Sequence, residues 1–288
     1  MIDLKIGEYV EIAIDWIALK GEPFFDAITV GIDSAVIGFQ ELLLFPNPFV
    51  LMAIFSTIAY WLLSRQHGPF TRRGFKSGIR MALFTAVGLF LIHGMGFWEE
   101  TCETLALVIA SAIIALIIGI PTGILASRND RFEQFIRPQL DLMQTMPAFV
   151  YLIPAILFFR VGNVPGVVAT VVFALPPGVR FTSLGIREVQ KDVIEAAHAF
   201  GCTKRQLLYK VQIPLAMPTI MAGVNQVIML SLSMVVIASM VGAGGLGQKV
   251  YTGILQAKIG LGFEAGLGIV IIAIFLDRLT QSFGQKND

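Results

Sequence analysis

The chain has 288 residues, of which 56% are hydrophobic and only 14% are charged, whereas about 25% of the residues of an ordinary soluble domain are charged. Its net charge of +1 provides no overall attraction to nucleic acid. The two cysteines, Cys102 and Cys202, have no Cys or His at metal-ligand spacing, so neither a disulfide framework nor a metal site is expected. The composition indicates a protein that is embedded in a lipid bilayer.

Residues 1–41 form an acidic N-terminal segment with eight acidic and two basic residues. The segment lacks the basic and apolar regions of a cleavable signal peptide. Apolar residues recur at helical spacing near its start, at Ile6, Val10, Ile14 and Ile17. We therefore expect an extracytoplasmic segment that is either an amphipathic helix on the membrane surface or a frayed acidic leader whose negative charge permits export.

Seven later stretches are long enough to cross a bilayer, which takes about 20 mainly apolar residues. Pro46, Asn47 and Pro48 interrupt the first of them. The stretches cover residues 42–63, 79–97, 104–126, 142–159, 164–181, 216–241 and 265–279. The expected fold class is an all-α, polytopic bundle of about seven transmembrane helices.

The charged residues between these stretches alternate in sign, and basic residues tend to stay on the cytoplasmic side of a membrane. Residues 64–80 hold five basic residues and no acid, whereas Glu99, Glu100 and Glu103 follow the second stretch without a base. This alternation predicts an N-terminus outside and a C-terminus in the cytoplasm. Two peripheral transmembrane helices joined by a basic cytoplasmic loop would then cover residues 42–100, a core domain of five helices residues 101–281, and a cytoplasmic tail residues 282–288.

The apolar stretches lack the charged residues that ion-coupled carriers place within the bilayer. Residues 216–248 contain no charge at all. His93, Arg160 and Asp277 fall near the ends of stretches, where a structural role is expected. Two alternatives are therefore disfavoured: an ion-gradient symporter, by the missing charges, and a membrane enzyme, by the lack of clustered catalytic residues. No catalytic residue is assigned.

The glycines at 242, 244 and 247 match G-x-G-x-x-G, but they follow a membrane stretch and not the strand that a dinucleotide site requires. A phosphate-binding loop is also excluded, because Gln248 precedes Lys249 and no Ser or Thr follows it. The chain is expected to bind no nucleotide or cofactor itself. These glycines indicate either a turn that closes the longest stretch or close helix packing.

Small residues four apart allow membrane helices to approach closely. Gly119 and Gly123 have this spacing, and we expect them to pack against another helix. Gly162 and Gly166 have it too, but we expect them to form a turn.

The loop over residues 178–214 is far longer than a turn between two membrane helices requires. Asp192 can begin a short helix that Gly201 ends, and Thr203 can cap a second helix that Pro214 ends. The loop is therefore predicted to contain helix, glycine turn and helix.

The pattern Glu195-Ala-Ala-x3-Gly201-x9-Val211-x-Ile213-Pro214 resembles the EAA loop of ABC importer permeases, whose consensus is EAA-x3-G-x9-I-x-LP. The resemblance places this loop at residues 185–215 and implies a coupling helix that sits in a groove of a separate ATPase. The residues it assigns to ATPase docking are Glu195, Ala196, Ala197, Gly201, Ile213 and Pro214. Val211 and Ile213 depart conservatively from the consensus.

Residues 141–280 are similar to glycine betaine/proline betaine permeases, through segments such as Met146-Pro-Ala-Phe-Val-Tyr-Leu-Ile-Pro154 and Phe173-Ala-Leu-Pro-Pro177. The resemblance implies an ABC type I importer permease fold in the bacterial inner membrane. Its implied partners are a second copy of the chain, a cytoplasmic ATPase dimer that holds ATP and Mg, an extracytoplasmic solute-binding protein and membrane lipid. Choline, carnitine, proline, a sulfonium compound or a methionine-type solute remain alternative cargoes.

Polar or polarizable side chains recur at a few places in the otherwise apolar stretches. Two readings are open for them, contact with the transported solute or ordinary helix packing. These candidate pathway-lining residues are Met146, Phe149, Tyr151, Ser231, Ser233 and Met234.

Overall fold

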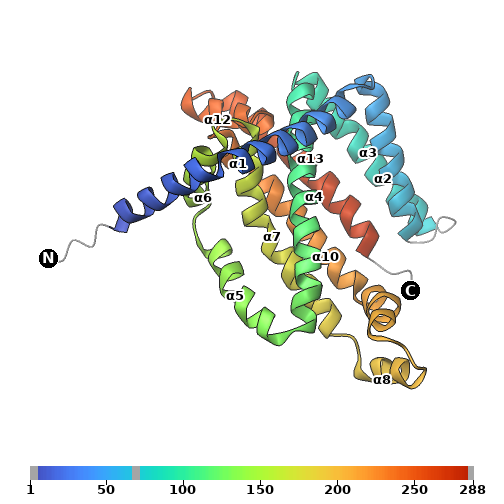
Figure 1. Ribbon diagram of the computed structural model, residues 1–288. Coiled ribbons are helices and arrows are strands. Elements are labelled where there is room, and N and C mark those ends of the chain that lie inside the picture. Colours follow the sequence, from blue (N-terminus) through green and yellow to red (C-terminus); the bar gives the residue numbers. More distant parts are fainter. Residues whose placement is uncertain (1–5, 67–71, 285–288) are drawn as a thin grey trace.

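The computed structural model describes residues 6–66 and 72–284, and in that part of the chain every regular element is a helix (Figure 1). The expected all-α fold is confirmed. In chain order the helices are α1 (Ile6–Leu44), α2 (Pro48–Gln66), α3 (Arg72–Gly94), α4 (Trp98–Arg128), α5 (Asp130–Thr145), α6 (Ala148–Phe159), α7 (Asn163–Arg187), α8 (Lys191–Ala199), α9 (Lys204–Gln206), the π-helix η1 (Leu207–Gln212), α10 (Ile213–Ser233), α11 (Val235–Ser239), α12 (Leu246–Leu255) and α13 (Ile259–Gly284). The extreme ends of the predicted N-terminal segment and tail lie outside the described residues.

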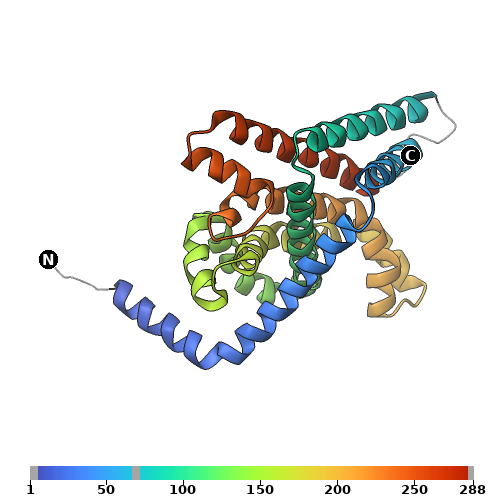
Figure 2. The same ribbon diagram turned by 90° about the horizontal axis from the view of Figure 1, so that it is seen from above.

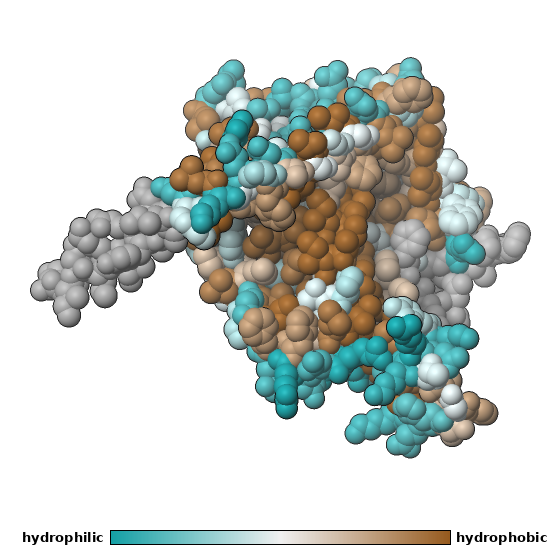
Figure 3. Space-filling model, viewed as in Figure 1, coloured by the Kyte–Doolittle hydropathy of each residue, from teal (hydrophilic) through white to brown (hydrophobic). Residues whose placement is uncertain are grey.

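Seven helical segments of the described chain are long and apolar enough to cross a membrane, as expected in number. Figure 3 shows a broad apolar region across the middle of the visible face, with hydrophilic residues gathered toward the two ends of the molecule. The segments are Ile14–Leu44, Pro48–Arg65, Gly74–Gly94, Trp98–Arg128, Asn163–Arg187, Lys204–Ser239 and Ile259–Ser282. The set differs from the prediction in two ways. Ile14–Leu44, near the N-terminus, is included, and the predicted stretch 142–159 is not one of the seven.

The N-terminal helix α1 is much longer than the periodicity at residues 6–17 predicts, since it continues to Leu44. Figures 1 and 2 show it crossing one side of the bundle obliquely, near the end that carries α12, with α2 and α3 on one flank of the molecule and α5 and α6 on the other. Four of its acids, Asp15, Glu22, Asp26 and Asp33, recur at intervals of seven, four and seven residues, which places them on one face of the helix. The Phe25 ring stacks on Phe158 of α6 with 4.6 Å between ring centroids.

The predicted stretch 42–63 is wrong at its start, because the chain breaks between α1 and α2. Asn47 caps α2 by accepting a hydrogen bond from the Phe49 amide at 3.1 Å. Pro48 occupies the first position of α2, where its missing N–H costs nothing. The prolines that interrupt this stretch therefore separate two helices.

The predicted single span over residues 142–159 is also wrong. Helix α5 ends at Thr145, helix α6 begins at Ala148, and the two are bent by 98°. Pro147 forces the residue before it out of helical conformation, and Met146 accordingly has φ −73° and ψ 137°. The corner turns the chain from α5, which slopes away from the bundle, back to its flank (Figure 1).

The centre of the bundle is α7, which packs between α4 and α10 through small residues. A Cβ atom on Gly123 of α4 would lie 2.6 Å from the Thr182 Cβ and 2.6 Å from the Val179 carbonyl oxygen. A Cβ atom on Gly223 of α10 would lie 2.6 Å from the Phe181 Cβ. The expected packing role of Gly123 is confirmed, and the three backbones approach as closely as glycine permits.

Gly162 and Gly166, the second glycine pair, have different roles. Gly162 has φ 150° and lies in the turn before α7, as expected. Gly166 lies inside α7, where a Cβ would meet the Ala238 Cβ at 2.9 Å, so the expectation of a turn is wrong for this residue.

Substituting Gly123 by alanine should destabilise the bundle by about 1–3 kcal/mol, the usual cost of overpacking. The new methyl group would press on the Val179 carbonyl oxygen, which cannot rotate away. Gly266→Ala in α13 is the matched control, because no atom of the described residues lies within 4 Å of a Cβ there. Thermal unfolding of the purified protein in detergent checks this. Equal unfolding temperatures for the two variants would contradict the packing described here.

Gly242, Gly244 and Gly245 form a turn at the end of the bundle that carries α12, whereas Gly247 lies inside α12, where a Cβ would lie 2.4 Å from the Val235 carbonyl oxygen. Both readings of this motif, a turn and close helix packing, therefore apply. Gly242 and Gly245 have φ 96° and 85°, a region that side chains other than glycine rarely enter. The Leu246 amide donates to the Thr104 hydroxyl of α4 at 2.8 Å, and the Gly244 amide donates to the Asn163 side chain at 3.3 Å. The turn thus joins α4, α7 and α12.

Candidate functional site

The segment between α7 and α10 protrudes from the end of the bundle opposite α1 and α12 (Figure 1). Helix α7 ends at Arg187, and α8 begins four residues later at Lys191, with Asp192 in its first turn. Asp192 therefore lies where a negative charge stabilises a helix, as predicted. Basic residues of α4, α5, α7 and α9 are found at this same end of the bundle, whereas Glu99, Glu100 and Glu103 begin α4 at the other end.

Gly201 ends α8 with a pair of hydrogen bonds typical of a Schellman motif. Its amide donates to the His198 carbonyl at 2.9 Å, and the Cys202 amide donates to the Ala197 carbonyl at 3.1 Å. The φ angle of Gly201 is 76°, in the left-handed region. The predicted glycine turn is confirmed, and its geometry explains why the motif has a glycine here.

Thr203 caps the next helical turn, as predicted. Its hydroxyl accepts a hydrogen bond from the Gln206 amide at 3.3 Å, and its own amide donates to the Gln206 side chain at 2.8 Å. These two bonds form a capping box around α9. The entry of the chain into the second limb of the loop is therefore fixed locally.

The prediction that Pro214 ends this second helix is wrong. The helix continues through η1 into α10, and the Ile213 amide donates to the Leu208 carbonyl in π-helical fashion. A proline inside a regular α-helix loses one hydrogen bond and clashes with the preceding turn. The π-helical turn directly before Pro214 is the kind of local adjustment that accommodates such a residue.

The second limb of the loop is anchored to the bundle by apolar contacts. Leu208 of η1 is buried in a cluster with Ile186 of α7 and with Ala216 and Ile220 of α10, and Ile213 packs against it. Ile213 therefore contributes to seating the loop on the membrane helices. Arg128 of α4 adds a hydrogen bond to the Lys204 carbonyl at 3.1 Å.

The exposed side of the loop is formed mainly by α8. Glu195, Ala196, Gly201 and Pro214 are exposed, whereas Ala197 is buried. The structure also exposes Phe200 by 89%, a residue that the motif leaves unspecified. A large aromatic side chain directly before the glycine that ends α8 was the signal that could have identified it.

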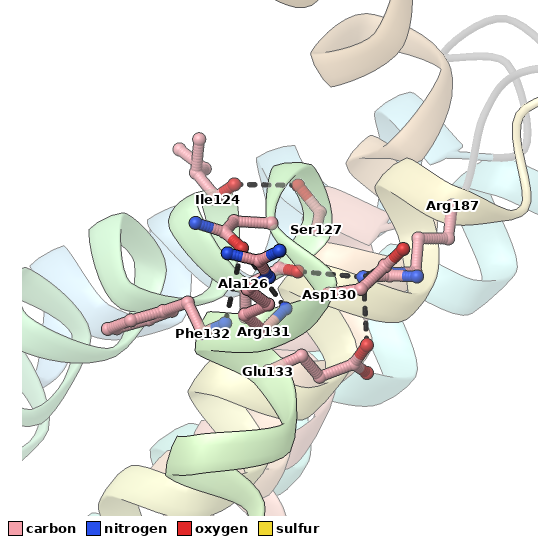
Figure 4. A network of polar contacts seen from close by, with 9 residues as sticks. Ile124, Ala126, Ser127, Asp130, Arg131, Phe132, Glu133 and Arg187 are labelled. Atoms are coloured by element: carbon pink, nitrogen blue, oxygen red, sulfur yellow. Dashed lines mark hydrogen bonds and ion pairs between the residues drawn. The ribbon is translucent and has the colours of Figure 1, made fainter.

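Arg187, the last residue of α7, contacts three oxygen atoms at the junction of α4 and α5 through its guanidinium group (Figure 4). Its Nη2 atom lies 2.8 Å from the Ala126 carbonyl oxygen, 2.7 Å from the Asp130 carboxylate and 2.8 Å from the Glu133 carboxylate. Asn129 caps α5 at this junction by accepting from two backbone amides. The end of α7 that carries α8 is thus joined directly to the start of α5.

A second ion pair, between Arg180 of α7 and Asp141 of α5, joins the two helices about two turns further along. Between the two ion pairs lies a cavity of about 360 Å³. It is lined by Ala126, Glu133, Ile136, Arg137, Leu140, Val179, Arg180, Phe181, Ser183, Leu184 and Arg187. Helix α5 therefore stands off α7 between its two ends.

The candidate pathway residues fall into two groups. Met146, Phe149 and Tyr151 surround the corner between α5 and α6, and the Tyr151 hydroxyl lies 3.1 Å from the Leu142 carbonyl oxygen and 2.6 Å from the Met143 carbonyl oxygen. Tyr151 also packs against the cluster that contains Met234. The corner and the end of α10 are thus brought together.

The serines of the second group donate their hydroxyl protons within α10. Ser231 is buried and donates to the Val227 carbonyl at 2.8 Å, and Ser233 is exposed and donates to the Met229 carbonyl at 2.9 Å. Met234, between α10 and α11, is buried. In this conformation Phe149 and Ser233 are therefore more accessible to a solute than Ser231 and Met234.

The polar residues near the end of α13 satisfy one another. Asn225 of α10 donates to the Asp277 carboxylate at 3.0 Å, and Gln281 donates to the same carboxylate at 2.8 Å. The Thr280 hydroxyl donates to the Asn225 side chain. These bonds connect α10 with α13 and agree with a structural role for Asp277.

Comparison with known proteins gives consistent matches. Residues 115–287 match the family described as binding-protein-dependent transport system inner membrane component. The chain is 49% identical to the glycine betaine transport system permease protein OpuAB of Bacillus subtilis, over 98% of this chain and 95% of the relative. It is 48% identical to the glycine betaine/proline betaine transport system permease protein ProW of Escherichia coli, over 99% of this chain and 76% of the relative. An inward-facing structure of the MetNI methionine ABC transporter shares the fold, with a TM-score of 0.56 and 22% identity over 72% of this chain and 99% of that chain.

Proposed function

Because this chain belongs to the family of binding-protein-dependent transport system inner membrane components, we propose that it is the membrane-spanning subunit of an ATP-driven importer of glycine betaine, proline betaine and related quaternary ammonium solutes. The chain is a multi-pass protein of the bacterial inner membrane. ATP and Mg would be bound by a separate ATPase and not by this chain. A second copy of the chain and an extracytoplasmic solute-binding protein would complete the importer.

The observation that carries the proposal is the protruding loop of α8, α9 and η1. It combines an exposed helix, a left-handed glycine and a capped second limb at the spacing of the ATPase-docking motif. Its anchoring through Leu208 and Ile213 lets a force applied to α8 reach α7 and α10 directly. A loop that only covered the bundle would have no need to expose Phe200.

We place this loop on the cytoplasmic side, where the ATPase would dock. The basic residues that accompany it, among them Arg128, Arg131 and Arg187, support that orientation. The end with α1 and α12 would then face the binding protein. Glu100 and Lys249, which form an ion pair of 3.0 Å, lie at this outer end.

The choice of solute rests on the relatives, which are named as permeases for glycine betaine and proline betaine. A quaternary ammonium group cannot donate hydrogen bonds, so it is recognised by aromatic faces and dispersion contacts. The uncharged stretch of residues 216–248 would offer such a solute a weakly attractive route.

Uptake of radiolabelled glycine betaine into proteoliposomes tests the proposal. The vesicles would carry this chain and its ATPase, with the binding protein and the solute outside. ATP would be present in or absent from the vesicle lumen, which corresponds to the cytoplasm. ATP-dependent uptake that survives collapse of ion gradients is expected. ATP-dependent uptake of proline without uptake of glycine betaine, carnitine or choline would overturn the proposed class of solute, and uptake driven by an ion gradient without ATP would overturn the importer class.

A further inference from the structure

The link between α8 and the candidate pathway begins at Arg187. This residue ends α7 and is separated from α8 only by residues 188–190. Its guanidinium group contacts three oxygens, and all three belong to the junction of α4 and α5 (Figure 4). Any displacement of α8 that rotates or shifts the end of α7 therefore acts first on the start of α5.

Helix α5 is suited to respond to such a displacement. It is held on α7 by ion pairs at its two ends, Arg187 with Asp130 and Glu133, and Arg180 with Asp141. The cavity of about 360 Å³ lies between these attachments. Closely packed helices cannot move independently, whereas a helix that stands over a cavity has room to tilt.

The movement of α5 would be passed on to α6 by the corner at residues 146–147. The Tyr151 hydroxyl lies within hydrogen-bonding distance of two carbonyl oxygens in the last turns of α5, those of Leu142 and Met143. This contact joins α6 to the last turns of α5 across the corner. Helices α5 and α6 then move as one bent unit, which carries Met146, Phe149 and Tyr151.

We propose that Arg187 is the positioning residue that transmits movement of α8 to α5 and α6, and so couples ATP hydrolysis to movement of the solute. This inference rests on the proposed function. The ion pairs are partly exposed, since the Arg187 side chain is 35% and the Asp130 side chain 79% accessible. Pairs of this kind contribute little to folding, so their removal leaves an assembled protein in which coupling can be measured.

The test uses the complete importer in proteoliposomes and measures solute moved per ATP hydrolysed. Arg187→Gln removes the donor, and the double variant Asp130→Asn with Glu133→Gln removes the acceptor charges. Each should assemble with the ATPase and hydrolyse ATP, but move at least about tenfold less solute per ATP. Combining all three changes should cause no further loss, because the changes remove the same interaction. Arg187→Lys, which keeps the charge, should recover part of the ratio.

Arg131→Gln is the matched control. Arg131 lies in the first turn of α5, next to Asp130, and among the described residues its side chain forms no ion pair. A solute-to-ATP ratio for Arg187→Gln equal to that of Arg131→Gln would overturn the inference. Losses that multiply when the changes are combined, or a complex that falls apart, would also overturn it. Absence of ATP-dependent uptake by the wild-type importer would overturn the proposed function, and this inference with it.

Discussion

Replacing Gly201 by valine is expected to lower ATP-driven uptake at least about tenfold while the membrane bundle stays folded. The φ angle of 76° at this position costs a residue with a Cβ about 1–2 kcal/mol, and more for a β-branched side chain. Relief of that strain would open the Schellman turn, in which the Gly201 and Cys202 amides bond to the end of α8. The exposed face of α8 would then lose its fixed direction relative to the second limb of the loop.

Gly201→Asn separates backbone strain from steric exclusion of the partner. Asparagine tolerates the left-handed region, and within residues 6–66 and 72–284 no atom lies within 4 Å of a Cβ at this position. We expect Gly201→Asn to retain clearly more uptake and ATPase binding than Gly201→Val, with equal unfolding temperatures for the two proteins in detergent. Wild-type affinity of Gly201→Val for the ATPase would show that the turn geometry is irrelevant to docking.

Phe200→Ala is expected to weaken binding of the ATPase roughly 30-fold, because a buried aromatic anchor contributes about 2 kcal/mol or more to an interface. Phe200 is 89% exposed in the chain alone, so its removal takes nothing from the folded core. The loss would therefore appear in the complex only. Titration of the ATPase against the purified chain in nanodiscs measures it directly.

Phe45→Ala provides the control for this measurement. Phe45 is 92% exposed, but it lies between α1 and α2 at the other end of the bundle. Its removal should leave ATPase affinity unchanged. If Phe200→Ala bound as tightly as Phe45→Ala, the exposed aromatic ring would not belong to the docking surface.

The loop of α8, α9 and η1 could be predicted in detail because its features are local. Thr203 with Gln206 is a short-range capping box, and Gly201 ends a helix through bonds to residues only three and five positions back. Local patterns of this kind can be read from spacing alone. Phe200 was missed because the motif places no constraint on it, and its exposure depends on how the whole loop stands on the bundle.

Other errors have identifiable causes. The corner at Pro147 could have been predicted, since a proline restricts the residue before it, but the hydropathy of residues 142–159 concealed the break. The continuation of the helix through Pro214 could not, because a π-helical turn is stabilised by the tertiary cluster around Leu208. The full length of α1 was hidden by its acids, whose alignment along one face becomes apparent only when a helix is assumed.

The packing of α7 also has a mechanical consequence. Its closest contacts with α4 and α10 are made at Gly123 and Gly223, where backbone meets backbone or the first atoms of side chains. Such contacts contain no long side chains that could change rotamer and absorb a load, and close-packed interiors are hardly compressible. We therefore expect α4, α7 and α10 to move as one rigid unit when α8 is displaced. Deformation would then be concentrated in the helices on the flanks of this unit.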